Sequence, residues 1–194
     1  MAGQLSPDDR RALLALARTG VARAIGLVTV EELPNHPVYD YQAGAFVTLH
    51  VGGELRGCVG NPDAFSRLGE VIVRCAAAAA REDPRFPPMT AADWPTLSIE
   101  ISVLSQLMRC DAPESLVIGR HGVAVELGHR RGLLLPQVPV AHGWSVPTFL
   151  AHTCRKAGLP ADAWQRGAVI YSFEADVFHE RSHADGPGAL PTVP

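Results

Sequence analysis

The feature that most constrains the fold is a double glycine between two strand-like stretches, in the segment GAFVTLHVGGELRGCVG at residues 44–60. Gly52 and Gly53 readily adopt the positive φ angles that a two-residue hairpin turn requires. On both sides of them, β-branched, aromatic and aliphatic residues favour extended backbone. The sequence therefore predicts a β-hairpin with strands at 45–51 and 54–60.

Hydrophobic periodicity predicts the remaining elements. Apolar residues recur every three or four positions after Ser6 and Pro7, which offer an N-cap and a proline in the first turn. The segment LSIEISVLS at 97–105 instead alternates, as a half-buried strand does. Because helices and strands are both present, we predict an α+β fold with mixed or antiparallel sheets flanked by helices. The predicted helices are 8–25, 64–81 (capped by Asn61 or Asp63) and 145–158, and the further strands are 97–104, 122–127, 131–135 and 168–178.

Composition argues against several classes of partner. The net charge is only -3, from 17 basic and 20 acidic residues, so we expect neither nucleic acid nor an anionic membrane surface as a partner. No apolar run approaches the roughly 20 residues that span a bilayer, and the N-terminus lacks the apolar core of a secretory signal. Four cysteines at wide spacings suggest free thiols in a reducing compartment. We therefore expect a cytoplasmic protein, with a disordered tail at 183–194 because that segment is rich in Gly and Pro.

Cys58 is the main candidate for chemistry. Strict pairing across a Gly52–Gly53 turn places Cys58 opposite Val47, with Arg56 on the same strand face as Cys58. A guanidinium there would favour the thiolate, which is the nucleophilic form of cysteine. Two glycines that flank the cysteine, Gly57 and Gly60, lack a Cβ and would leave room for a ligand. The alternative is a small buried cysteine beside an arginine that extends to solvent.

Other residues complete or limit this site. A cysteine nucleophile needs a base, but strict pairing puts His50 on the opposite face, and only a bulge at Gly57 would bring it to Cys58. Asp83 and Arg85 can pair across a tight turn in EDPRFPP, and Glu100 projects from the polar face of its strand. The metal-binding and nucleotide-binding motifs of common enzymes are missing from the sequence, so we expect no cofactor and no dedicated metal site.

Several ordered motifs give the chain a resemblance to a known family. They are GAFVTLHVGGELRGCVGN, EDPRFPPMT, LSIEISVLS, RRGLLLPQV and FLAHTCRKAGLPADAW, and the likeness runs from about Leu13 to Phe178. The chain resembles the family named for the Alport syndrome, midface hypoplasia and elliptocytosis chromosomal region protein, whose bacterial members are called AmmeMemoRadiSam system protein A. The resemblance implies an α+β fold of two packed, intertwined subdomains within one domain at 1–182.

The resemblance also points to a site. The family's six-residue motif stands here as LRGCVG at 55–60, with Val59 where isoleucine is usual, and the resemblance implies that it lies at a groove. Cys58 and Arg56 are the candidate catalytic residues. The candidate binding residues are Gly57, Gly60, Asp83, Arg85, Glu100 and Gln137.

Two functions stay open at this point. In the first, Cys58 is an activated thiol that attacks a small molecule, Arg56 holds an anionic group, and backbone N–H groups at Gly57 and Gly60 receive developing charge. In the second, the groove is a non-catalytic binding or adaptor module for a peptide, a modified nucleoside or a protein. The family's name also implies two possible partners, a Memo-like protein and a radical S-adenosylmethionine protein.

Overall fold

The structure, a computed structural model, describes residues 5–27, 35–62 and 64–180. The chain forms two compact units, and each is described here by itself. Residues 104–176 form what we call the inserted unit, and the described residues before 104 and after 176 form the main unit. The tail predicted at 183–194 lies outside the described residues, and the domain boundary at 182 stays a prediction.

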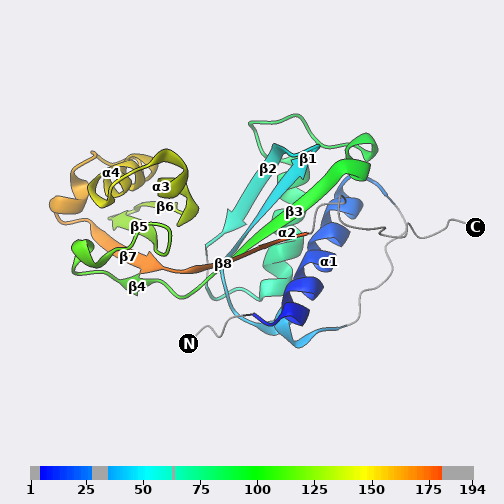
Figure 1. The fold of residues 1–194 in the computed structure, drawn as a ribbon, viewed down its shortest axis with the longest axis horizontal. Helices are drawn as coiled ribbons and strands as arrows, with labels where there is room; N and C mark the ends of the chain where they lie inside the picture. The colour runs from blue at the N-terminus through cyan, green and yellow to red at the C-terminus, as the bar shows by residue number, and fades with distance from the viewer. Residues whose placement is uncertain (1–4, 28–34, 63, 181–194) are drawn as a thin grey trace, which may run out of the picture. The chain divides into compact units, whose positions relative to one another are not determined.

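The main unit contains the predicted hairpin. Its sheet has the strand order β2-β1-β3-β8, with β1 at Ala45–Val51, β2 at Glu54–Asn61, β3 at Leu97–Leu104 and β8 at Ala175–His179 (Figure 1). β1 pairs antiparallel with both β2 and β3. Gly52 and Gly53 form the turn with φ angles of 60° and 88°, which confirms the sequence prediction.

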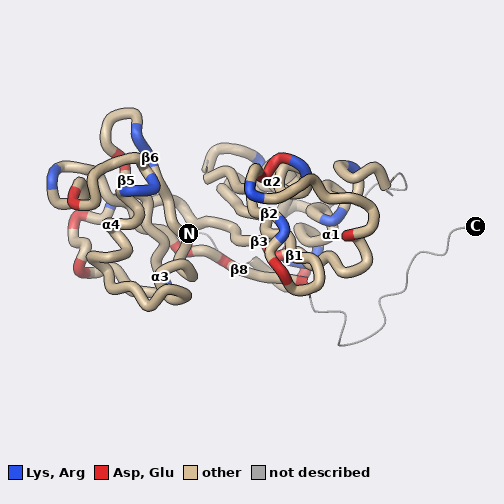
Figure 2. Tube along the Cα trace, turned by 90° about the horizontal axis from the view of Figure 1, so that it is seen from above, with Lys and Arg blue, Asp and Glu red and all other residues tan. Residues whose placement is uncertain are grey.

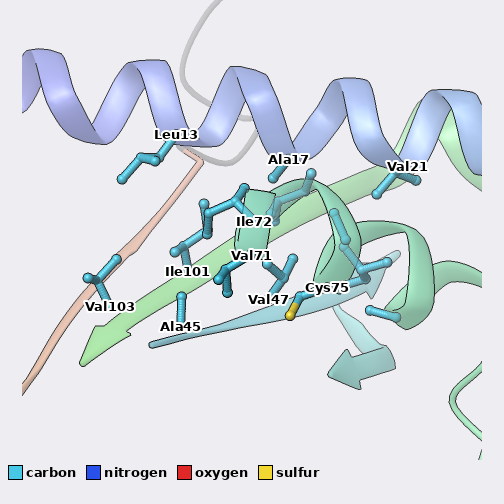
Figure 3. Close-up of a cluster of buried hydrophobic side chains, with 14 of the residues drawn as sticks. Leu13, Ala17, Val21, Ala45, Val47, Val71, Ile72, Cys75, Ile101 and Val103 are labelled. Carbon is cyan, nitrogen blue, oxygen red and sulfur yellow. The ribbon is translucent and has the colours of Figure 1, made fainter. Parts of the chain in front are cut away.

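Two helices cover the apolar face of this sheet. They are α1 at Pro7–Ala24 and α2 at Leu68–Arg81, and α2 packs against both α1 and the hairpin (Figure 3). Gly20 lets α1 approach α2 closely, because a Cβ there would lie 3.2 Å from that of Ala76. The core between helices and sheet includes Leu13, Ala17, Val21, Ala45, Val47, Val71, Ile72, Ile101 and Val103.

The starts of the two helices differ in how well the sequence predicted them. At α1, Ser6 accepts a hydrogen bond from the Asp9 N–H and the Asp9 side chain bonds back to Ser6, as the capping pattern indicated. The second helix begins at Leu68 rather than at 64, with Arg67 as its N-cap. Residues before it bond elsewhere, since Arg67 bridges to Gln42 and the Ser66 carbonyl accepts the Ala43 N–H. These contacts prevent the helix from extending backwards.

The inserted unit has a second antiparallel sheet, with the strand order β4-β7-β5-β6 (Figure 1). Helix α4 packs on β5 and β6, and Phe149, Leu150 and Cys154 of α4 are buried in its core. The two sheets and their helices confirm an α+β fold. The elements are β4 at Met108–Arg109, β5 at Gly122–Leu127, β6 at Arg130–Leu134, α3 at Gln137–His142, α4 at Val146–Lys156 and β7 at Val169–Phe173.

The strand predicted at 168–178 is two strands that belong to different sheets. β7 ends at Phe173 and β8 begins at Ala175. Between them, Glu174 exchanges hydrogen bonds with Ser105 through its N–H and its carbonyl. The extended pattern of the sequence was correct, but local pattern carries no information on which sheet each half joins.

Charged residues are mixed over both units. Figure 2 shows Lys and Arg interspersed with Asp and Glu along the trace of each unit. Within the described ranges, no helix is both long enough and apolar enough to cross a membrane.

Candidate functional site

A bulge in β2 corrects the predicted pairing of Cys58. The register shifts between Leu49 and His50, so that Arg56 is an extra residue and Cys58 pairs with Thr48. Val47, the predicted partner of Cys58, pairs with Val59 instead. Side chains of directly paired residues lie on the same face of a sheet, so the bulge decides which side chains share a face with the thiol.

The bulge brings His50 to the face of Cys58. His50 lies two residues along β1 from Thr48, and side chains two residues apart point to the same side. Glu100 pairs with Thr48 from β3, so Cys58, Thr48 and Glu100 form a row across three strands. We call this surface the cysteine face; its partly exposed polar residues are Thr48, His50, Cys58, Ser98 and Glu100.

Cys58 is held through both its side chain and its backbone. The Thr48 hydroxyl donates to the Cys58 sulfur at 3.2 Å. The Cys58 N–H points out of the sheet edge and donates to Oδ2 of Asp83 at 2.9 Å. Because that N–H is not directed at β1, Cys58 and Thr48 form a non-hydrogen-bonded pair, the kind in which side chains lie closest.

Asp83 is the buried acceptor that ties the loop after α2 to the edge of β2. Its side chain is 4% exposed, and besides the Cys58 N–H it accepts the Arg85 N–H at 3.1 Å. The Arg85 guanidinium donates to both oxygens, from Nε at 3.0 Å and from Nη2 at 2.7 Å. These bonds, with the Arg85 side chain the largest influence, hold the pKa of Asp83 well below its usual range. The turn predicted between Asp83 and Arg85 is present.

Arg85, rather than Arg56, shares a hydrogen-bond partner with Cys58, because its Nη2 and the Cys58 N–H both donate to Oδ2 of Asp83. The pKa of the Arg85 guanidinium is raised, chiefly by its hydrogen bonds to Asp83. Arg56 donates instead to the carbonyls of Pro87 and Pro88 and lies 3.8 Å from Asp93. The sequence predicted Arg56 beside the thiol, whereas the structure bonds Arg56, the extra residue of the bulge, to the proline loop.

The two glycines near Cys58 serve packing. A Cβ on Gly57 would lie 2.1 Å from the Ala79 carbonyl oxygen, so α2 fills the space that we had expected a ligand to use. A Cβ on Gly60 would meet the ring of Phe46, also at 2.1 Å. At both positions, neighbouring groups occupy the volume that a side chain would need: the backbone of α2 at Gly57 and a side chain at Gly60.

The remaining candidate residue and the other three cysteines are described one by one. Gln137 is exposed at the start of α3 in the inserted unit, and its role as a binding residue stays a prediction. Cys75 and Cys154 are buried, which raises the pKa of each thiol. Cys110 is partly exposed, and its thiol donates to the Ala112 carbonyl.

Comparison with known proteins decides the family. The model of the AMMECR1 family matches residues 14–178. The chain belongs to the AMMECR1 family. A protein of Methanocaldococcus jannaschii is 44% identical over 162 residues, which cover 79% of this chain and 80% of that protein. A protein of Methanopyrus kandleri is 41% identical and covers 96% of this chain and 95% of its own length.

A solved structure has the same fold as this chain. The crystal structure of an uncharacterized protein of Pyrococcus horikoshii superposes with a TM-score of 0.85 at 35% identity, covering 95% of this chain and 97% of that chain. The LRGCVG motif and the Asp83–Arg85 turn both lie within the matched span of the AMMECR1 family. The cysteine face therefore belongs to the part of the chain that the family shares.

Proposed function

We propose that this AMMECR1 protein uses Cys58 as the nucleophile of a small-molecule site on the cysteine face. The observation that carries the proposal is the hydrogen bond from the Thr48 hydroxyl to a partly exposed sulfur, on a surface that also presents His50 and Glu100. A donor aimed at sulfur stabilises the thiolate, which is the form of cysteine that attacks.

The residues divide into roles by position. His50 is diagonal to Cys58 across the hairpin, at a spacing that long side chains can bridge with a substrate or one water between them. In the supported reaction, the thiol gives its proton to the His50 imidazole and forms an S–C bond to a carbonyl carbon. The carbonyl electron pair moves to its oxygen, which then takes up that proton. Thr48 orients the sulfur, and Glu100 supplies a carboxylate next to Thr48 on the other side.

Site-selective alkylation tests the proposal. Native protein is treated with iodoacetamide at pH 7, and the rate at each cysteine is measured by mass spectrometry of peptides. We expect Cys58 to react first, Cys110 more slowly, and the two buried thiols only after unfolding. A Cys110→Ser protein gives the rate at Cys58 without the second accessible thiol.

Two variants separate an activated thiol from one that only lines a binding surface. Thr48→Val keeps the shape of the side chain and removes the donor, and we expect it to slow alkylation of Cys58 at least about threefold. Thr96→Val, at an exposed threonine of the main unit, is the matched control and leaves the rate unchanged. Equal rates in the wild type and Thr48→Val would contradict the enzyme proposal and favour a non-catalytic binding module.

We also propose that this chain is an AmmeMemoRadiSam system protein A located in the cytoplasm. There it would work with a radical S-adenosylmethionine protein and a Memo-like protein. The support is the sequence resemblance together with membership of the AMMECR1 family. All four cysteines are free, as a reducing compartment would keep them. Affinity purification from the native host with mass spectrometry tests the partnership, and recovery of neither protein would contradict it.

A further inference from the structure

We propose that Arg85 is the anion-binding residue of the cysteine face and that the substrate attacked by Cys58 is a small organic acid, with a carboxylate next to its electrophilic carbon. This inference rests on the proposed function of Cys58. It assigns to Arg85 a role for which Arg56 was the first candidate, and the reason lies in how the two guanidinium groups are bonded.

Arg85 lies close to Cys58 because both bind the same oxygen. The Arg85 Nη2 and the Cys58 N–H both donate to Oδ2 of Asp83, at 2.7 Å and 2.9 Å. The two nitrogens are therefore separated by no more than these two hydrogen-bond lengths. Arg56 has no such link, since it binds the carbonyls of the proline loop.

The Arg85 guanidinium is held in place by Asp83 and is still accessible to solvent. Asp83, its anchor, is 4% exposed, whereas the Arg85 side chain is 57% exposed. The fork to Asp83 uses Nε and Nη2, and Phe86 lies against the guanidinium with its ring centroid 5.4 Å away. Among the described residues, none accepts a hydrogen bond from Nη1, so one edge of a pre-oriented guanidinium is available to a ligand.

The available edge selects the class of ligand. A guanidinium presents parallel N–H groups that match the two oxygens of a carboxylate, and a guanidinium already held by a buried partner loses little conformational entropy on binding. A carboxylate held by Arg85 keeps the rest of a small molecule near the sulfur of Cys58. The inference therefore concerns the acid group of the substrate and not the rest of the molecule.

A pair of alkylating reagents tests the inference separately from the reactivity of the thiol. Iodoacetate and iodoacetamide both form an S–C bond and release iodide, but only iodoacetate carries a carboxylate next to the reacting carbon. The ratio of their rate constants at Cys58 therefore reports anion binding, because a change in thiol reactivity alters both rates equally. We expect Arg85→Gln to lower the iodoacetate-to-iodoacetamide ratio about threefold to tenfold, as the loss of one nearby unit charge would.

Matched controls guard against a general effect of charge or of folding. Arg74→Gln removes an exposed arginine of α2 in the same unit and should leave the ratio unchanged. In the unmodified protein, sodium acetate should slow iodoacetamide labelling of Cys58, whereas acetamide at the same concentration, with ionic strength matched by sodium chloride, should not. A ratio unaffected by Arg85→Gln, or no protection by acetate, would overturn the inference while leaving Cys58 reactive. Failure of iodoacetamide to label native Cys58 would instead overturn the proposed function itself.

Discussion

Replacing Asp83 by asparagine should destabilise the main unit more than its place in a surface loop suggests. The buried carboxylate accepts four hydrogen bonds, two from backbone N–H groups and two from the Arg85 side chain. An asparagine has the same shape but only one acceptor atom, and its amino group would face a donor. The Cys58 N–H, or the Arg85 fork, would then lack an acceptor.

The size of the effect follows from these contacts. A buried N–H left without a partner costs about 1–3 kcal/mol. The ion pair itself adds little, about 1 kcal/mol or less, because Arg85 is more than half exposed and solvent screens the attraction. We therefore expect Asp83→Asn to lower the free energy of unfolding by about 2–3 kcal/mol at pH 7.

The difference in stability between wild type and Asp83→Asn should decrease at low pH. Because the folded-state pKa of Asp83 is depressed, its contribution is complete above the unfolded pKa, about 3.9, and is lost as the pH falls toward the folded value. Urea unfolding followed by Trp94 fluorescence measures both proteins at pH 7 and pH 3, and their difference should shrink at pH 3. The exposed Asp111→Asn, which removes a surface partner of Arg109, is the control and should change nothing. Equal stability of Asp83→Asn and wild type at pH 7, or a gap of the same size at pH 3, would refute this reasoning.

Three further substitutions test the packing. Gly57→Ala places a carbon 2.1 Å from a backbone oxygen of α2, and we expect a loss of about 3 kcal/mol or more in urea unfolding. Gly60→Ala meets only the ring of Phe46, which can turn, so a loss as large as that of Gly57→Ala would contradict the argument. Arg18→Gln removes the two hydrogen bonds that the Arg18 guanidinium donates to Glu180, and we expect it to lower the free energy of unfolding by about 1–3 kcal/mol. A urea midpoint equal to that of wild type would argue against a stabilising role for this pair.

The hairpin and the core were predictable because their signals are local. The double glycine specifies a tight turn wherever it falls between strands, and the alternation in β3 gives its buried face directly. The bulge at Arg56 was not predictable, since one extra residue in an edge strand leaves the local pattern of ELRGCVG unchanged. Because of that extra residue, Cys58 pairs with Thr48 instead of Val47, and His50 lies on the same face of the sheet as Cys58.

The link between Arg85 and Cys58 through Asp83 depends on a contact distant in sequence. Asp83 reaches the edge of β2 from 25 residues away, and nothing in the motif around Cys58 specifies where that loop lies. The sequence did indicate that Asp83 and Arg85 pair, because their spacing suits a tight turn. The sequence also suggested that Gly57 and Gly60 leave space for a ligand, but α2 and Phe46 fill that space.

The most direct test of the central claim compares Cys58 in the folded protein with the same cysteine in the synthetic peptide GELRGCVGN. The peptide keeps the neighbours in sequence, including Arg56, and lacks Thr48, His50 and the fixed Arg85. Second-order rate constants for iodoacetamide are measured for both from pH 5 to pH 9. If the cysteine face activates the thiol, native Cys58 should react about tenfold faster than the peptide at pH 7. A native rate equal to or below that of the peptide across the whole range would contradict the claim that Cys58 is a nucleophile.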